Sequence, residues 1–249
     1  MSASIDQPLL RAEGLTRRFG GLLAVSNLSF SITPGEILGL IGPNGAGKST
    51  TFNLISGFHK LTSGKLFVDG KDVTGVKPAA IARLGLTRTF QHGSLMRGMS
   101  VRDNILVGAV GSLPRGSVKE RLARVEETAA LLGLSPHLGD IAGTLPHGLQ
   151  RLVSIAIGFA TRPRLLCLDE PLTGLNQTEV VRTLDVFGRI RSEFGCSILL
   201  VEHNMKAVMQ ICDRIVVLHH GQLLATGSPL EVRNNPAVIQ AYLGGRHAA

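Results

Sequence analysis

The chain has 249 residues, of which 44% are hydrophobic and 18% charged, with a formal net charge of +8 at pH 7. This length allows one large domain or two small ones with a buried core, so neither disulfides nor a structural metal are needed. The positive charge suits a nucleotide, a nucleic acid or an anionic membrane surface equally well, and it excludes none of them.

Targeting signals and membrane spans are not apparent in the sequence. Residues 1–6 lack the basic and apolar regions of a secretion signal, and no apolar run approaches the roughly 18 residues that span a bilayer. Cys167, Cys196 and Cys212 lack a CxxC spacing and lie in or beside apolar stretches, which predicts buried free thiols. We therefore expect a protein of a reducing compartment, the cytoplasm.

The first part of the chain has the pattern of β-strands. From Leu9 to about Asp72, short stretches of alternating residues are separated by turns rich in glycine and proline. The clearest of them, residues 24–32 and 65–69, predict strands. This part is therefore predicted to be a β region.

A phosphate-binding loop lies within this region, between an apolar strand at 37–41 and a helix that begins near Gly47. Its residues are Gly42, Pro43, Asn44, Gly45, Ala46, Gly47, Lys48, Ser49 and Thr50. The glycines allow successive N–H groups to turn onto an anion, to which the helix adds its positive dipole end. Lys48 is expected to reach the β- and γ-phosphates, and the Ser49 hydroxyl to ligate Mg²⁺. The loop predicts a nucleoside triphosphate site.

The middle and the end of the chain differ in their periodicity. Between about residues 91 and 161, apolar residues recur at intervals of three and four. This predicts helices at 101–107, 118–132 and 149–160. Thereafter strands alternate with helices, at 165–168, about 178–194, 197–201, 205–212 and 214–218. Such alternation predicts an α/β fold with a parallel sheet covered on both faces, into which a helical lobe is inserted.

Two adjacent carboxylates, Asp169 and Glu170, end the apolar strand at 165–168. Ligands of open α/β sheets bind at the carboxyl ends of the strands. Successive strand residues point to opposite sides, so Asp169 can face Mg²⁺ while Glu170 faces a water that attacks the γ-phosphate. In isolation an acidic strand end would rather cap a turn, but the upstream loop favours the catalytic interpretation.

Two further polar residues are candidates at the same edge of the sheet. His203 follows the strand at 197–201 and can bridge Glu170, water and phosphate. Gln91 begins the helical lobe, and its amide can contact water and Mg²⁺ and so sense the nucleotide. Taken alone, His203 is typical of a structural residue and Gln91 of an exposed one.

Taken together, these motifs resemble those of ATP-binding-cassette (ABC) ATPases. They follow in the order GPNGAGKST, Gln91, the segment LPHGLQR at 145–151, LLCLDEP and His203. Narrower stretches, including RFGGLLAV at 18–25, RTFQ at 88–91 and VEHNM at 201–205, resemble the ATPases of branched-chain amino-acid importers. So do EPLTGLN at 170–176 and RNNPAVIQAYLG at 233–244.

This resemblance implies a P-loop NTPase core in which a mostly parallel sheet is flanked by helices, with an antiparallel β subdomain and an inserted helical subdomain. The single cassette would occupy residues 1–249, with the core at about 1–90 and 162–249 and the helical subdomain at about 91–161. ATP and Mg²⁺ are the implied cofactors. Phe19 falls where the family stacks an aromatic ring on adenine, although an apolar strand would otherwise hold it in the core.

The resemblance also implies partners. In the family, the ATPase pairs head to tail with a second copy or a paralogue and drives a membrane permease that a periplasmic solute-binding protein supplies. This would place the chain peripherally on the cytoplasmic face of the inner membrane. No nucleic-acid partner is expected. The segment at 145–151, with Gly148, would point at the γ-phosphate that the partner subunit binds.

That segment departs from the family pattern. ABC ATPases usually have Leu-Ser-Gly-Gly-Gln, whereas this chain has Pro146 in place of the serine hydroxyl. A hydrogen bond to a charged group contributes about 1.5–3 kcal/mol, and proline also lacks an N–H, so phosphate contact would depend on the amides near Gly148 and the helix dipole. We hypothesise that the composite site, which this segment forms with the ATP bound by the partner subunit, is weaker than one with the usual signature. Such a site would suit a heterodimer with a different, unequal cassette. Asn176, where many ABC proteins have Asp, does not imply inactivity.

ATP hydrolysis coupled to import of amino acids or similar solutes is the favoured function. The alternatives are import of another solute such as urea or short amides, an ABC ATPase that acts on DNA or ribosomes, and a regulatory module without turnover. The last would predict a replaced Glu170 or His203, and both are present. Leu95, Met96 and Met99 are either a surface for the permease or part of the lobe's own core.

Overall fold

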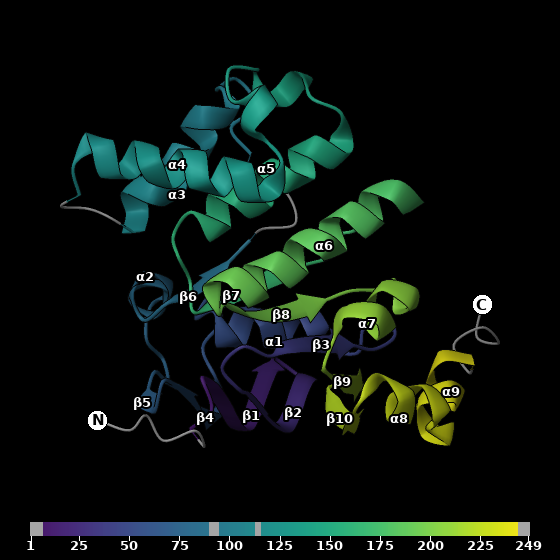
Figure 1. The fold of residues 1–249 in the computed structure, drawn as a ribbon. Coiled ribbons are helices and arrows are strands. Elements are labelled where there is room, and N and C mark those ends of the chain that lie inside the picture. Colours follow the sequence, from purple (N-terminus) through teal and green to yellow (C-terminus); the bar gives the residue numbers. More distant parts are fainter. Residues whose placement is uncertain (1–6, 90–94, 113–115, 244–249) are drawn as a thin grey trace.

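The computed structural model describes residues 7–89, 95–112 and 116–243, which form two sheets and their covering helices (Figure 1). The first sheet has the strand order β2-β1-β4-β5 and is antiparallel. Its strands are β1 (Leu10–Phe19), β2 (Leu22–Ile32), β4 (Ser63–Val68) and β5 (Lys71–Asp72). The predicted strands at 24–32 and 65–69 are confirmed and belong to this antiparallel sheet, whereas the strand at 37–41, within the same predicted region, belongs to the second sheet.

The second sheet has the order β10-β9-β3-β8-β7-β6. Its strands are β3 (Ile37–Ile41), β6 (Leu86–Arg88), β7 (Leu165–Asp169), β8 (Ser197–Val201), β9 (Arg214–His219) and β10 (Gln222–Gly227). All neighbouring pairs are parallel except β9 and β10. The segments that follow β3, β7 and β8 therefore meet at one edge of the sheet.

The parallel strands are buried on both faces, as their apolar sequences predict. Alternate residues of each strand belong to two different apolar clusters: Leu166 and Leu168 join one, and Leu165 and Cys167 the other. The first cluster contains residues of the helices that come after residue 100 in the chain. The second contains Phe52 and residues of the antiparallel sheet. The six-stranded sheet is thus covered on both faces.

Within the described parts of the chain there are nine α-helices, besides two short 3-10 helices at Ser135–His137 and Ala142–Thr144. They are α1 (Lys48–Ile55), α2 (Pro78–Arg83), α3 (Val101–Ser112), α4 (Val118–Leu132), α5 (His147–Phe159), α6 (Gln177–Phe194), α7 (Met205–Ile211), α8 (Pro229–Asn234) and α9 (Pro236–Leu243). Figure 1 shows α3, α4 and α5 grouped at one end of the molecule and the antiparallel sheet at the other.

Local signals fix where the long helices begin and end. Ser117 and Glu120 form a reciprocal capping box at the start of α4, and Asn176 and Glu179 form another at the start of α6. Both helices end at a glycine in the left-handed conformation, which the absence of a Cβ permits. The predicted limits of these helices are confirmed to within a residue.

The three cysteines are buried free thiols, as predicted. Burial raises the pKa of Cys196 and of Cys212 to about 12, because a thiolate would be poorly solvated there. Among the helices that the structure describes, none is long and apolar enough to cross a membrane.

Asn104 secures the segment that precedes α3. Its side chain is fully buried, accepts a hydrogen bond from Met96 N at 2.8 Å, and donates to Met96 O at 3.0 Å and to Ser100 O at 2.9 Å. We expect Asn104→Ala to lower the free energy of unfolding by about 2–4 kcal/mol, because buried backbone groups lose their partners. Urea denaturation measures this, with the exposed Asn234→Ala as control. An equal effect of both substitutions would contradict this role.

Candidate functional site

The loop at 42–50 adopts a conformation that only its glycines allow. Gly42, Gly45 and Gly47 have φ of 154°, 77° and 98°. A Cβ on Gly42 would lie 2.3 Å from Leu218 O, and one on Gly47 would lie 2.7 Å from Ala24 O. The loop leads from buried β3 into α1, which begins at Lys48. The N–H groups of the first turn of α1 are thereby directed to the loop, as an anion site requires.

Lys48 lies beneath this loop and is almost completely buried. Its Nζ donates hydrogen bonds to Gly42 O at 2.7 Å and to Pro43 O at 3.0 Å. Burial lowers the pKa of Lys48, while the charges of Glu170 and Asp169 raise it. The ammonium is therefore held by two carbonyls that it can exchange for phosphate oxygens.

Asp169 ends β7 as a buried carboxylate. Its Oδ2 lies 3.2 Å from Nη2 of Arg88, which is on the neighbouring strand β6. Desolvation raises the pKa of Asp169, and the charge of Arg88 lowers it. The Arg88 guanidinium also lies 4.6 Å from the ring centroid of Phe52 on α1. Arg88 thus links the carboxylate to the helix that follows the phosphate loop, a role that the sequence did not indicate.

Glu170 and His203 meet at the same edge of the sheet. His203 Nε2 lies 2.5 Å from Glu170 Oε1, and the Glu170 side chain is 18% exposed. Glu170 has a positive φ of 47°, and its N–H donates to Val201 O on β8 at 2.8 Å. A non-glycine residue in the left-handed region is strained, and such strain is common at functional sites.

Glu202 holds the turn that carries His203. Its buried carboxylate accepts hydrogen bonds from the backbone N–H groups of Leu172 at 2.7 Å and of His203 at 3.0 Å. Desolvation raises the pKa of Glu202, and these backbone hydrogen bonds lower it. Glu202 therefore joins the segment after β7 to the segment after β8. The sequence did not single it out, because its partner Leu172 lies 30 positions away in the chain.

A cavity of about 430 Å³ brings together most of the predicted residues. It is lined by Leu22, Leu23, Ala24, Asn44, Gly45, Ala46, Gly47, Lys48, Ser49, Thr50, Glu170, His203, His220 and Gly221. Gly221 is tied to the loop, since its N–H donates to Ala46 O at 3.0 Å and its carbonyl accepts from Ser26 N at 2.8 Å. One open space thus adjoins both the phosphate loop and the Glu170–His203 pair.

Of the predicted residues that the structure describes, five are not among those that line this cavity: Gly42, Pro43, Phe19, Gly148 and Asp169. Gln91 lies outside the described residues. Phe19 is described, and its ring contacts His59 at a centroid distance of 5.3 Å and the Arg17 guanidinium at 4.4 Å. Phe19 is not among the residues that line the cavity, whose apolar wall comes instead from Leu22 and Leu23 of β2. The placement of Phe19 against a base, which the resemblance implies, stays a prediction.

The segment at 145–151, which departs from the family pattern, forms the start of α5, with Pro146 at the N-cap. Gly148 is buried, and a Cβ there would lie 2.3 Å from Glu179 Oε1. Glu179 belongs to the capping box at the start of α6, so the two helix starts pack together. A side chain at position 148 would therefore have to displace the Glu179 carboxylate.

We expect Gly148→Ala to lower the free energy of unfolding by about 1–3 kcal/mol, because the added methyl displaces the Glu179 carboxylate. Gly188→Ala on α6 is the matched control: nothing lies within 4 Å of its Cβ position, so the variant should gain about 0.5–1 kcal/mol. Thermal or urea unfolding would show both shifts, and a stabilised Gly148→Ala would contradict the packing.

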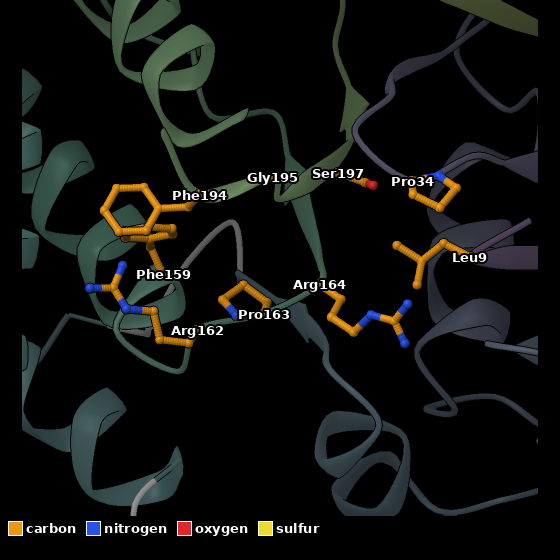
Figure 2. Close-up of a pocket in the computed structure, with 9 residues that line it drawn as sticks. All are labelled: Leu9, Pro34, Phe159, Arg162, Pro163, Arg164, Phe194, Gly195 and Ser197. Carbon is orange, nitrogen blue, oxygen red and sulfur yellow. The ribbon is translucent and has the colours of Figure 1, made fainter. Parts of the chain in front are cut away.

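A second cavity, of about 290 Å³, lies at the opposite edge of the sheet, beside the starts of β7 and β8 (Figure 2). The Arg162 guanidinium lies 4.3 Å from the Phe194 ring centroid and is paired with Glu127. Arg164 is paired with Asp69 at 2.6 Å. Because its two arginines already have carboxylate partners, we assign no anion to this cavity.

Comparisons with known proteins identify the family of the chain. The family model described as ABC transporter matches residues 25–173, and that of the branched-chain amino acid ATP-binding cassette transporter matches 222–248. The high-affinity branched-chain amino acid transport ATP-binding protein LivG of Escherichia coli is 43% identical, over 96% of this chain and 99% of that protein. BraF of Pseudomonas aeruginosa, which has the same description, is 40% identical over 96% of this chain and 99% of that protein.

A solved structure also matches the fold of this chain. The ADP conformation of an ATP-binding cassette of an ABC transporter superposes with a TM-score of 0.86 and 30% identity, covering 96% of this chain and 99% of the other. The phosphate loop, the paired carboxylates after β7 and the histidine after β8 thus occur in a fold and a sequence that both match one family. The chain belongs to the ABC transporter family, as a nucleotide-binding ATPase cassette.

Proposed function

We propose that this chain is the ATP-hydrolysing subunit that energises an importer of branched-chain or other hydrophobic amino acids. The observation that carries the enzymatic part is the 2.5 Å contact of His203 with Glu170 at a cavity that the phosphate loop lines. The cargo is supported by the names of the relatives and by the family match at 222–248.

In this proposal the loop at 42–50 binds the ATP phosphates through its N–H groups and the start of α1. Lys48 transfers its hydrogen bonds from Gly42 O and Pro43 O to the β- and γ-phosphates. This costs little reorganisation, because the ammonium is already desolvated beneath the loop. Thr50 and Asn44 line the same cavity and complete the phosphate contacts.

Ser49 and Asp169 would hold Mg²⁺, because hydroxyl and carboxylate oxygens are the ligands that this ion prefers. The donor set fits: Asp169 is buried at the end of β7, and the Arg88 contact involves only its Oδ2. When bound, Mg²⁺ would neutralise charge on the β- and γ-phosphates. Gln91 is proposed as a further contact to the ion and to water, in the role the family resemblance gives it.

Glu170 would orient the attacking water and accept its proton. His203, bonded to the same carboxylate, would fix the direction of Glu170 and reach the γ-phosphate. Both groups are placed by the backbone: Glu170 by its hydrogen bond to β8, and His203 by Glu202. Catalysis would thus depend on positioning and charge neutralisation.

We further propose that the whole chain is a single cassette, with the helical subdomain at about 91–161, that acts with a second cassette. The start of α5, at Gly148, would face the γ-phosphate of the partner. Pro146 offers neither a hydroxyl nor an N–H there, so this composite site would be the weaker one and would suit an unequal partner. Cooperative hydrolysis at an ordinary rate by the purified chain alone would contradict the unequal pair.

The cassette would bind a permease at the cytoplasmic face of the inner membrane, and a periplasmic binding protein would supply that permease. Met99 is 38% exposed and suits the contact, whereas Leu95 packs on the apolar core.

We expect Met99→Glu to release the protein from the host's membrane fraction without lowering the melting temperature, because a charge would enter an apolar contact. Val118→Glu, at a residue that is 70% exposed, is the control. Unchanged membrane retention of Met99→Glu would count against this surface.

Uptake in the native host tests the function. Deleting the gene should abolish high-affinity uptake of labelled leucine, isoleucine and valine. The wild-type gene should restore it, and a Glu170→Gln gene should not. Normal leucine uptake together with lost uptake of urea or a short amide would overturn the amino-acid cargo, while leaving the ATPase assignment in place.

A further inference from the structure

Arg88, at the end of β6, is nearly buried and bonds groups on two different elements. Its side chain is 12% exposed, and that of Asp169 is 6% exposed. Nη2 of Arg88 lies 3.2 Å from Asp169 Oδ2. Nη1 donates hydrogen bonds to Asn53 Oδ1 and, at 3.4 Å, to Ser56 Oγ. One guanidinium thus joins the carboxylate at the end of β7 to the C-terminal end of α1.

The side of α1 that Arg88 contacts also carries Ser49. Ser49 and Asn53 are four positions apart, and Ser56 follows three positions later, so the three lie along one side of the helix. Arg88 bonds the second and the third of them, and its other partner is Asp169. The side of α1 that is turned towards Asp169 is therefore the one on which Ser49 lies.

A guanidinium can fix this arrangement because it is planar and rigid. The directions of its N–H groups are set by covalent geometry, so the groups bonded to its two terminal nitrogens keep a defined spacing. The ring centroids of Phe52 and Phe58 lie 4.6 and 5.4 Å from Arg88 Cζ and hold the guanidinium in place. Both oxygens of Asp169 belong to one planar carboxylate, so a bond to Oδ2 also sets the direction of Oδ1.

We propose that Arg88 is a positioning residue for the metal site, which holds Asp169 in the orientation, relative to Ser49 on α1, that binding of one Mg²⁺ by both requires. The inference rests on the proposed function, in which Ser49 and Asp169 hold Mg²⁺. A guanidinium has no acceptor atom and cannot itself bind the ion, so Arg88 acts through the groups that it bonds. Residues that orient a metal ligand in this way contribute about 10–100-fold to metal affinity.

The test compares nucleotide binding with and without the metal. AMP-PNP, an ATP analogue that is not hydrolysed, is titrated in a calorimeter with Mg²⁺ or with EDTA. We expect Arg88→Met to weaken binding of MgAMP-PNP about 10–100-fold and that of metal-free AMP-PNP less than about twofold, because the phosphate loop keeps its own contacts. Mn²⁺ titrated into the complex with AMP-PNP, with free Mn²⁺ measured by electron paramagnetic resonance, should show the same loss of metal affinity.

Two further variants separate positioning from a general loss of stability. Arg88→Lys keeps the charge, but one ammonium cannot bond both elements, so we expect a smaller loss that is again confined to the metal-bound nucleotide. Arg214→Met is the matched control, because Arg214 bonds the buried Glu36 at 2.9 and 3.2 Å at the opposite edge of the same sheet. Its melting temperature should fall, while its affinity for MgAMP-PNP stays at the wild-type value. If Arg88→Met does not fold, Arg88→Lys decides.

Asp169→Asn provides the reference for a damaged metal site. It should lose affinity for MgAMP-PNP and Mn²⁺ but not for metal-free AMP-PNP. If Arg88 acts through Asp169, adding Arg88→Met to Asp169→Asn should change the affinity for MgAMP-PNP less than about twofold further, because the two substitutions remove one function.

The outcomes distinguish this inference from the proposed function. If Asp169→Asn loses metal affinity but the Arg88 variants keep it, or if they weaken both forms of AMP-PNP equally, Arg88 only stabilises the fold and the inference is overturned. If Asp169→Asn keeps full metal affinity, or the wild type binds no AMP-PNP in either form, the proposed function fails as well. A loss confined to the metal-bound form, absent from Arg214→Met, supports the positioning role.

Discussion

Glu170→Gln should lower kcat for ATP hydrolysis by about 10²–10⁴-fold while MgATP still binds. The carboxylate is placed at the cavity by His203, at 2.5 Å, and by the bond of its backbone N–H to Val201 O. An amide keeps the size and shape of this side chain but cannot accept a proton from water. Steady-state phosphate release gives kcat, and calorimetry gives the Kd.

Glu126→Gln is the matched control, since Glu126 forms a surface ion pair with Arg102. It should hydrolyse ATP at the wild-type rate. A Glu170→Gln enzyme that keeps more than a tenth of wild-type kcat would refute the assignment. The double variant Glu170→Gln/His203→Ala adds a second check: if His203 acts through Glu170, it should be no slower than the slower of the two single variants.

Lys48→Met should weaken MgATP binding by at least about 10- to 150-fold, because a charged hydrogen bond to phosphate contributes about 1.5–3 kcal/mol. Methionine has a similar length and is compatible with the buried position of Lys48 beneath the loop. Calorimetric titration with MgATP measures the change, and a melting curve shows that the variant is folded.

The control for this variant is Lys119→Met, at an exposed residue of α4. It removes the same charge from the protein and should leave the Kd unchanged. If Lys119→Met and Lys48→Met weaken binding equally, the effect would come from net charge and not from the loop.

The contiguous parts of the site could be predicted because one short segment contains both the residues and the local structure. The loop at 42–50 carries its glycines, its lysine and the start of α1 within nine positions. Asp169 and Glu170 could be placed because the apolar run before them is long enough for one buried strand. The pairing of Glu170 with His203 followed from the rule that the carboxyl ends of parallel strands share an edge.

Contacts that depend on strand order could not be predicted in this way. Arg88 reaches Asp169 because β6 lies beside β7, and Glu202 reaches Leu172 N because β8 lies beside β7. A single sequence contains no pattern that gives this order.

The sequence pattern predicts no element in residues 222–243. Strand β10 is at the edge of its sheet and mostly exposed, so it lacks the alternation of a half-buried strand. Helices α8 and α9, with six and eight residues, are too short to show a clear apolar period. For Phe19, the role at a base that the resemblance implies stays a prediction, and its side chain contacts His59 and Arg17.

A crystal structure of Glu170→Gln with MgATP tests the central claim most directly. We predict the triphosphate within the loop at 42–50, with Lys48 Nζ bound to phosphate oxygens and no longer to Gly42 O and Pro43 O. We also predict Ser49 and Asp169 at the metal, and residue 170 beside the γ-phosphate. A nucleotide bound elsewhere, or Lys48 still bonded to the two loop carbonyls beside bound ATP, would contradict this claim.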